Sequence, residues 1–107
     1  MAWVYLSVAG ILEIIWAAAM KHSEGFTRLG PSVVSLTAMV ASVVLLSISM
    51  KTLPLGTAYS IWTGIGAAGA FLFGIVMLGE QASVGRILAA ALIVSGIVLM
   101  KLTDTSA

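Results

Sequence analysis

Residues 2–20 read AWVYLSVAGILEIIWAAAM, an apolar run interrupted by a single charge at Glu13. A run of this length is enough for one helix to cross the hydrocarbon core of a bilayer, which needs about 20 residues. Charges elsewhere delimit three further apolar runs, because a charge at bilayer depth is costly and most charges therefore fall at the ends of spans. The sequence predicts an all-α membrane protein with four spanning helices, at about residues 2–21, 31–50, 54–78 and 83–102.

The composition supports the same class. The 107 residues are 61% hydrophobic and 8% charged, whereas soluble domains carry roughly 25% charged residues. A net charge of +1 provides no basic surface for nucleic acid. No cysteine and one histidine leave no disulfide, thiol chemistry or metal site to expect, and we predict no cofactor.

The organisation is expected to be one domain over residues 1–107, since the loops are short and no repeat is visible. The first run is not expected to be a signal peptide, because no Lys or Arg precedes it and Glu13 interrupts it. With four spans, two basic residues lie on one side of the membrane and three on the other. This weak charge bias suits insertion in both orientations, and therefore an antiparallel homodimer. A weak positive-inside signal, with Lys21, Arg28 and Arg86 cytoplasmic, is the alternative.

Glu13 is the most informative residue of the chain. It lies about 17 Å along the first helix, near the middle of a core about 30 Å thick. A carboxylate at this depth is expected to face protein or a water-filled cavity and to take part in transport. The alternative is a protonated side chain that only links helices by hydrogen bonds.

Helical spacing predicts which polar groups meet Glu13. A carboxylate, a hydroxyl, a phenol and two indoles can converge on one cavity, with the indole N–H of Trp16 oriented toward Glu13. Such a cavity suits an organic cation, and a proton would compete for the same carboxylate oxygens. An interfacial aromatic belt is the alternative for Tyr59 and Trp62. The predicted binding residues are Glu13, Trp16, Ser42, Tyr59 and Trp62.

The third span is long and rich in glycine, so we expect it to bend at Gly64, Gly66 and Gly69. A helix that bends suits a transporter. No phosphate-binding loop, nucleotide fingerprint or catalytic triad is present, so neither an enzyme nor a pump driven by ATP is expected.

Three stretches carry a family resemblance: residues 9–17 (AGILEIIWA), 25–32 (GFTRLGPS) and 54–66 (PLGTAYSIWTGIG). With them the chain resembles the small multidrug resistance family of bacterial inner-membrane exporters over nearly its full length. The resemblance implies an antiparallel, dual-topology homodimer in which two copies of Glu13 share one cavity and exchange protons for substrate. It also implies a multi-pass protein of the inner membrane.

Trp16, Gly10 and Met39 resemble the guanidinium-exporting subtype of that family, and Thr63 is a weaker candidate for the cavity lining. The predicted substrate is guanidinium or a small guanidinyl cation, exported in exchange for protons. A fourth-helix dimer contact is implied at Leu92, Ile93, Gly96 and Ile97, with packing inside one subunit as the alternative.

Other functions stay open at this stage. Within the family, the alternative is a multidrug exporter of quaternary ammonium or polyaromatic cations. Outside the family, one alternative is a structural membrane subunit, which would use Glu13 only to join helices. Another is a proton-conducting subunit of a rotary motor, in which Trp16, Tyr59 and Trp62 would have no role.

Overall fold

Four helices, connected by short loops, make up the fold. The computed structural model describes residues 1–103, and the tail 104–107, which the sequence left uninterpreted, lies outside the described residues. The helices are α1 (Ala2–His22), α2 (Leu29–Ser49), α3 (Leu55–Leu78) and α4 (Val84–Thr103). All four are long and apolar enough to cross a membrane, which confirms the predicted all-α membrane fold with four spans.

The helix ends follow local sequence signals. Helix α2 begins at Leu29, two residues before the predicted start, because Pro31 falls in its first turn, where no intrahelical bond needs its missing N–H. Helix α3 ends at Leu78, and its C-cap Gly79 has a φ of 68°, the left-handed conformation that glycine adopts without strain.

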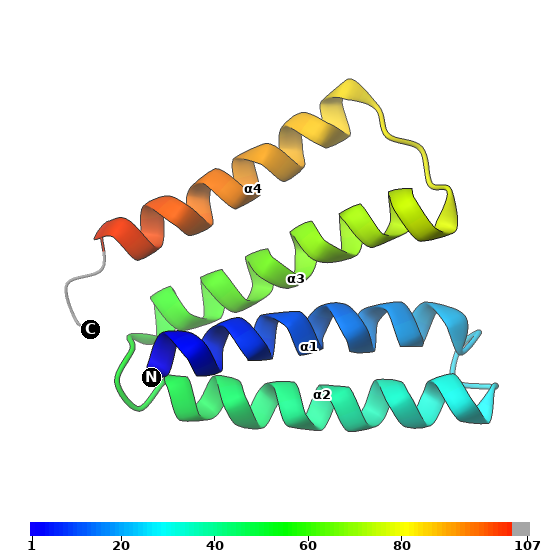
Figure 1. Cartoon of the computed structure of the whole chain (residues 1–107), viewed down its shortest axis with the longest axis horizontal. Coiled ribbons are helices and arrows are strands. Elements are labelled where there is room, and N and C mark those ends of the chain that lie inside the picture. The colour runs from blue at the N-terminus through cyan, green and yellow to red at the C-terminus, as the bar shows by residue number, and fades with distance from the viewer. Residues whose placement is uncertain (104–107) are drawn as a thin grey trace.

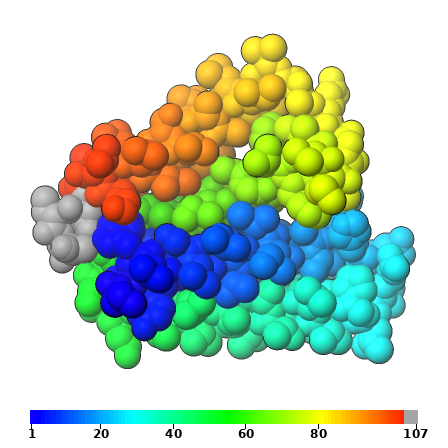
Figure 2. All heavy atoms as spheres, viewed as in Figure 1, coloured from blue at the N-terminus to red at the C-terminus, as the bar shows by residue number. Residues whose placement is uncertain are grey.

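The helices lie side by side in the order α2, α1, α3, α4 (Figure 1). The molecule measures 42 × 34 × 16 Å, and a single helix with its side chains is about 10–12 Å across. The chain is therefore a flattened layer of helices, in which α2 also contacts α3 directly and α4 lies at the edge. The space-filling view shows the α1–α2 loop in cyan and the α3–α4 loop in yellow at the same end of this layer (Figure 2).

The buried core lies toward the other end, where α1, α2 and α3 pack together. Its members are apolar side chains that are almost fully enclosed: Leu6, Ala9, Leu46, Leu53, Ala58 and Ile61. Helix α4 contributes no buried residue and its backbone packs against α3 alone. Lys101 joins α4 to α1 at this end, with its ammonium 4.9 Å from the centre of the Trp3 ring.

The α1–α2 loop is organised by Ser23, which is fully buried. Its hydroxyl donates to the carbonyl of Met20 at 2.7 Å and accepts the N–H of Phe26 at 2.9 Å. Its own carbonyl accepts the N–H of Thr27 at 2.9 Å. Residues 24–26 have φ values of 51°, 75° and 67°, so the turn is tight and left-handed, and Ser23 satisfies the polar groups at its start.

Candidate functional site

Three serines on α2 form a seam with α1. Ser35, Ser42 and Ser49 are seven residues apart, share one face of the helix and are fully buried. The hydroxyl of Ser35 donates to the carbonyl of Trp16 at 2.9 Å, and that of Ser42 donates to the carbonyl of Ala9 at 2.6 Å. Ser49 instead donates to Leu46 of its own helix at 2.7 Å. Two of the three serines thus tie α2 to the α1 backbone. We call Ser35, Ser42 and Ser49 together the serine seam.

Ser42 also reaches the third helix. Its hydroxyl accepts the indole N–H of Trp62 at 2.9 Å, and the Trp62 ring lies 5.6 Å, centre to centre, from the tilted ring of Tyr59. Ser42, Trp62 and Tyr59 are therefore brought together, as the sequence predicted, and one hydroxyl connects three helices.

Glu13 faces α3. Its carboxyl lies against the backbone of Gly66 so closely that a Cβ at that position would overlap it. Its Oε1 is buried and has no hydrogen-bond partner among the residues that the structure describes. A buried carboxyl oxygen without a partner is rare in proteins, which distinguishes Glu13 from the hydrogen-bonded serines of α2.

Trp16 is, with Glu13, one of two residues among those described that have a buried side-chain polar atom without a partner. Its indole Nε1 is buried and makes no hydrogen bond within residues 1–103, so the bond from Trp16 to Glu13 that the sequence suggested is not formed here. The carboxyl of Glu13 lies instead on α3 at Gly66. One donor and one acceptor, one helical turn apart on α1, are both left free.

The weaker candidates occupy different surroundings. Gly10 is buried, and a Cβ there would lie 2.7 Å from Cγ2 of Ile65, so Gly10 is a close contact between α1 and α3. Met39 is half-buried, whereas Thr63 is exposed and Tyr59 is 52% exposed. The predicted binding residues therefore differ in exposure: Ser42 is fully buried, Glu13, Trp16 and Trp62 are half-buried, and Tyr59 is exposed.

Three of the five glycines of α3, Gly64, Gly66 and Gly69, have a role that the sequence did not indicate. Gly66 receives the carboxyl of Glu13, Gly69 receives the side chain of Ile14, and Gly64 receives Ile97, whose Cδ1 would lie 2.7 Å from an added Cβ. They are contact points for α1 and α4 along one continuous helix, Leu55–Leu78. That α3 bends at these glycines stays a prediction.

The predicted dimer-contact residues of α4 divide between two surroundings. Ile97 packs on Gly64, with Ile93 beside it, and these two residues thus face α3 of the same chain. Leu92 is 66% exposed, and a Cβ added at Gly96 would meet nothing within 4 Å. All four line a cavity of about 230 Å³ between α3 and α4.

Comparison with known proteins identifies related sequences. A family model described as "Small Multidrug Resistance protein" matches residues 1–93. A guanidinium exporter of Yersinia pestis is 58% identical over 104 residues, which is 97% of this chain and 100% of the relative.

Two further relatives carry the same name. The guanidinium exporter of Salmonella typhimurium (strain LT2) is 56% identical over 103 residues, and that of Citrobacter freundii is 52% identical over 103 residues. Each alignment covers 96% of this chain and 98% of the relative. The likeness therefore extends over all four helices.

Proposed function

The chain belongs to the small multidrug resistance family, and from this premise we propose that it exports guanidinium and small guanidinyl cations in exchange for protons. Four spanning helices and its family make it a multi-pass protein of the bacterial inner membrane. Guanidinium as the substrate is supported by the names of its relatives. Under this proposal the protein is a transporter and not an enzyme.

The free oxygen of Glu13 is the observation that carries the proposal. As a carboxylate, Glu13 attracts a cation and accepts its N–H bonds, whereas protonation removes the negative charge and leaves only a neutral acceptor. Because Oε1 is buried and unpartnered, its next partner comes from outside the described chain. Proton and substrate then exclude each other, which is sufficient for exchange if the empty site opens to one side at a time.

The shape of guanidinium matches this site. The ion is planar and presents N–H groups in a fork that fits a carboxylate with two parallel hydrogen bonds. The aromatic rings of Trp16, Trp62 and Tyr59 offer cation–π attraction nearby. The Ser42 hydroxyl fixes the Trp62 ring, so this part of the site is rigid before substrate arrives. A bulky cation would need a wider and more adaptable space.

Two chains inserted in opposite orientations would complete the site. The buried Oε1 of Glu13 has no partner within the described chain, and Leu92 and Gly96 offer an exposed surface on α4. Single cysteines can test the orientation directly, because the chain has none of its own. Labelling one loop cysteine from each side of intact cells should give two populations. A single orientation would contradict the antiparallel homodimer.

Transport by the purified protein in liposomes tests the function. We expect guanidinium to drive proton movement across the vesicle membrane, and tetraethylammonium to do so much less well. A preference for tetraethylammonium would instead support a multidrug exporter. No substrate-driven proton movement with either ion would contradict exchange altogether.

A further inference from the structure

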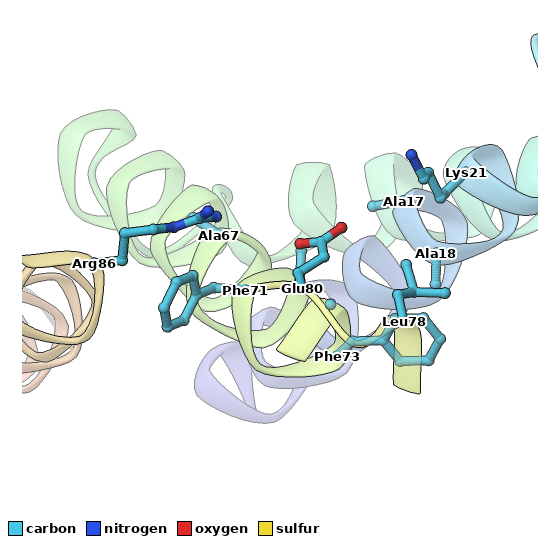
Figure 3. Close-up of a pocket in the computed structure, with 11 residues that line it drawn as sticks. Ala17, Ala18, Lys21, Ala67, Phe71, Phe73, Leu78, Glu80 and Arg86 are labelled. Carbon is cyan, nitrogen blue, oxygen red and sulfur yellow. The ribbon is translucent and has the colours of Figure 1, made fainter. Parts of the chain in front are cut away.

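A second site lies at the loop end of the layer, apart from the Glu13 face. A cavity of about 350 Å³ opens there between α1, α3 and α4. Its polar lining is Lys21, Glu80 and Arg86, and in Figure 3 the carboxylate of Glu80 lies between the two basic side chains. The cavity therefore presents one negative group flanked by two positive groups.

The negative group is built into the end of α3. The backbone N–H of Glu80 donates to the carbonyl of Gly74 at 3.0 Å, which folds the residue back over the helix. Its carboxyl lies against Gly74, where a Cβ would overlap it. The last carbonyls of a helix are partially negative and unpaired, and a carboxylate beside them is unfavourable unless a cation joins it.

The positive groups come from the other two helices. Lys21 lies in the last turn of α1. The guanidinium carbon of Arg86, near the start of α4, lies 5.5 Å from the centre of the Phe71 ring, so its position is fixed by an aromatic face. An anion placed between Lys21 and Arg86 would be attracted by both, but it would also lie near Glu80.

The rest of the lining is apolar. Below the charged mouth, the cavity wall consists of small and aromatic side chains: Ala17, Ala18, Ala67, Ala70, Phe71, Phe73 and Leu78. All three charged residues lie at ends of spanning helices, and thus at the level of the lipid headgroups. Basic pockets between spanning helices at this level are suited to lipid headgroups.

We propose that this cavity binds the headgroup of a phosphoethanolamine lipid. The phosphodiester lies between Lys21 and Arg86, the primary ammonium donates to Glu80 and to the carbonyls at the end of α3, and an acyl chain lies along the apolar wall. A headgroup with a phosphate alone would leave its charge facing Glu80 uncompensated. A choline headgroup would bring a positive charge but no N–H to donate.

Native mass spectrometry of the full chain in detergent can measure this selectivity. The probes are phosphatidylethanolamine, phosphatidylcholine and phosphatidylglycerol with identical acyl chains. We expect the ethanolamine lipid to bind about tenfold more tightly than the choline lipid, the size of one charge-assisted hydrogen bond. A preference for phosphatidylglycerol over phosphatidylethanolamine would overturn the proposal.

Two variants test the negative group. Glu80→Gln should reduce the preference for ethanolamine over choline to about one. Gly74→Ala should have a similar effect, because the added methyl displaces the carboxyl. Gly85→Ala is the matched control, since a Cβ there meets nothing within 4 Å. An unchanged preference in both Glu80→Gln and Gly74→Ala would overturn the proposal.

Two further variants test the positive groups. Lys21→Met and Arg86→Met should each weaken binding of all three phospholipids about tenfold. Arg28→Met removes a cation from the same end but outside the cavity, and should leave binding unchanged. Equal effects of Arg28→Met and Arg86→Met would show a general surface attraction and contradict a built site.

A separate displacement experiment tests whether the acyl chain contributes to binding. Glycerophosphoethanolamine has the same headgroup and no chains, so it should fail to displace bound phosphatidylethanolamine at equal concentration. Displacement would identify a site for a soluble phosphoethanolamine and would overturn the assignment to a membrane lipid.

Discussion

The contact of α1 with α2 and its contact with α3 differ in whether their buried polar groups form hydrogen bonds. Toward α2, the hydroxyls of the serine seam are all bonded, two of them to α1 itself. Toward α3, the contact is made by a carboxyl against a glycine, and the buried Oε1 of Glu13 has no partner. Both surroundings are buried, so burial alone does not distinguish them.

This difference in hydrogen bonding distinguishes a contact that stabilises the fold from one that can bind a ligand. A buried polar group whose hydrogen bonds are formed within the protein stabilises the packing and has no bond to offer a ligand. A buried polar group without hydrogen bonds destabilises the fold unless a ligand or a proton binds it. The α1–α2 seam is therefore the support, and the α1–α3 contact is where substrate and proton are expected to act.

The largest expected effect comes from Glu13. Glu13→Gln keeps the volume of the side chain but removes the carboxylate for which proton and cation compete, so coupled exchange should be abolished. Substrate-driven proton movement in liposomes is the measurement, with the exposed loop residue Glu24→Gln as the control. Exchange that persists in Glu13→Gln would place the functional site elsewhere.

Gly66→Ala should be nearly as severe. The added methyl would overlap the Glu13 carboxyl, which must then move, and a displacement of about 1 Å at a reacting group can cost about a hundredfold in rate. Gly56→Ala lies on the same helix and adds a methyl into open space, so it should transport normally. Equal transport rates in the two variants would mean that the carboxyl does not work from this position.

A smaller effect is expected at Trp16, and it concerns selectivity. Trp16→Gly removes a free indole N–H and the ring volume beside Glu13, so guanidinium affinity should fall roughly ten- to a hundredfold and larger cations should be better accepted. Trp16→Phe keeps most of the volume without the donor and separates the two contributions. Competition between guanidinium and a tetraalkylammonium ion measures both. An unchanged preference in Trp16→Gly would remove the indole from the site.

The serine seam should affect stability first. Ser42→Ala leaves the carbonyl of Ala9 and the N–H of Trp62 without this hydroxyl, at an expected cost of about 1–2 kcal/mol in the free energy of unfolding. Ser49→Ala should cost less, because Ser49 bonds only to the carbonyl of Leu46 in its own helix and its loss leaves no side-chain donor without an acceptor. Denaturant titration in detergent compares the two. A larger loss in Ser49→Ala would contradict the distinction between bonds across helices and bonds within one.

Sequence reasoning reached the four spans because charges are excluded from bilayer depth, a constraint that needs no tertiary information. The fixed period of a helix also places residues seven apart, such as Ser35, Ser42 and Ser49, on one face. Helix α2 begins at Leu29, two residues before the expected start, because the span was placed from its charge-free run and the first helical turn accepts Pro31.

The site was only partly predictable. Spacing within a helix shows which residues share a face, but it does not show the rotation of one helix against another. For that reason the contact of Glu13 with Gly66 and the bond from Ser42 to Ala9 were not foreseen. The glycines of α3 illustrate the difficulty, since a glycine that bends a helix and one that receives a neighbouring side chain look the same in a sequence.

The Ser23 turn has a consequence for biosynthesis. It joins neighbouring helices through local bonds, so α1 and α2 can pair as a hairpin while α3 is still being synthesised. Helix α2 is more hydrophobic than α1. We expect the pairing with α2 to favour insertion of α1, which carries Glu13, into the bilayer. Membrane insertion of Glu13 would then depend on a helix that mainly stabilises the folded protein.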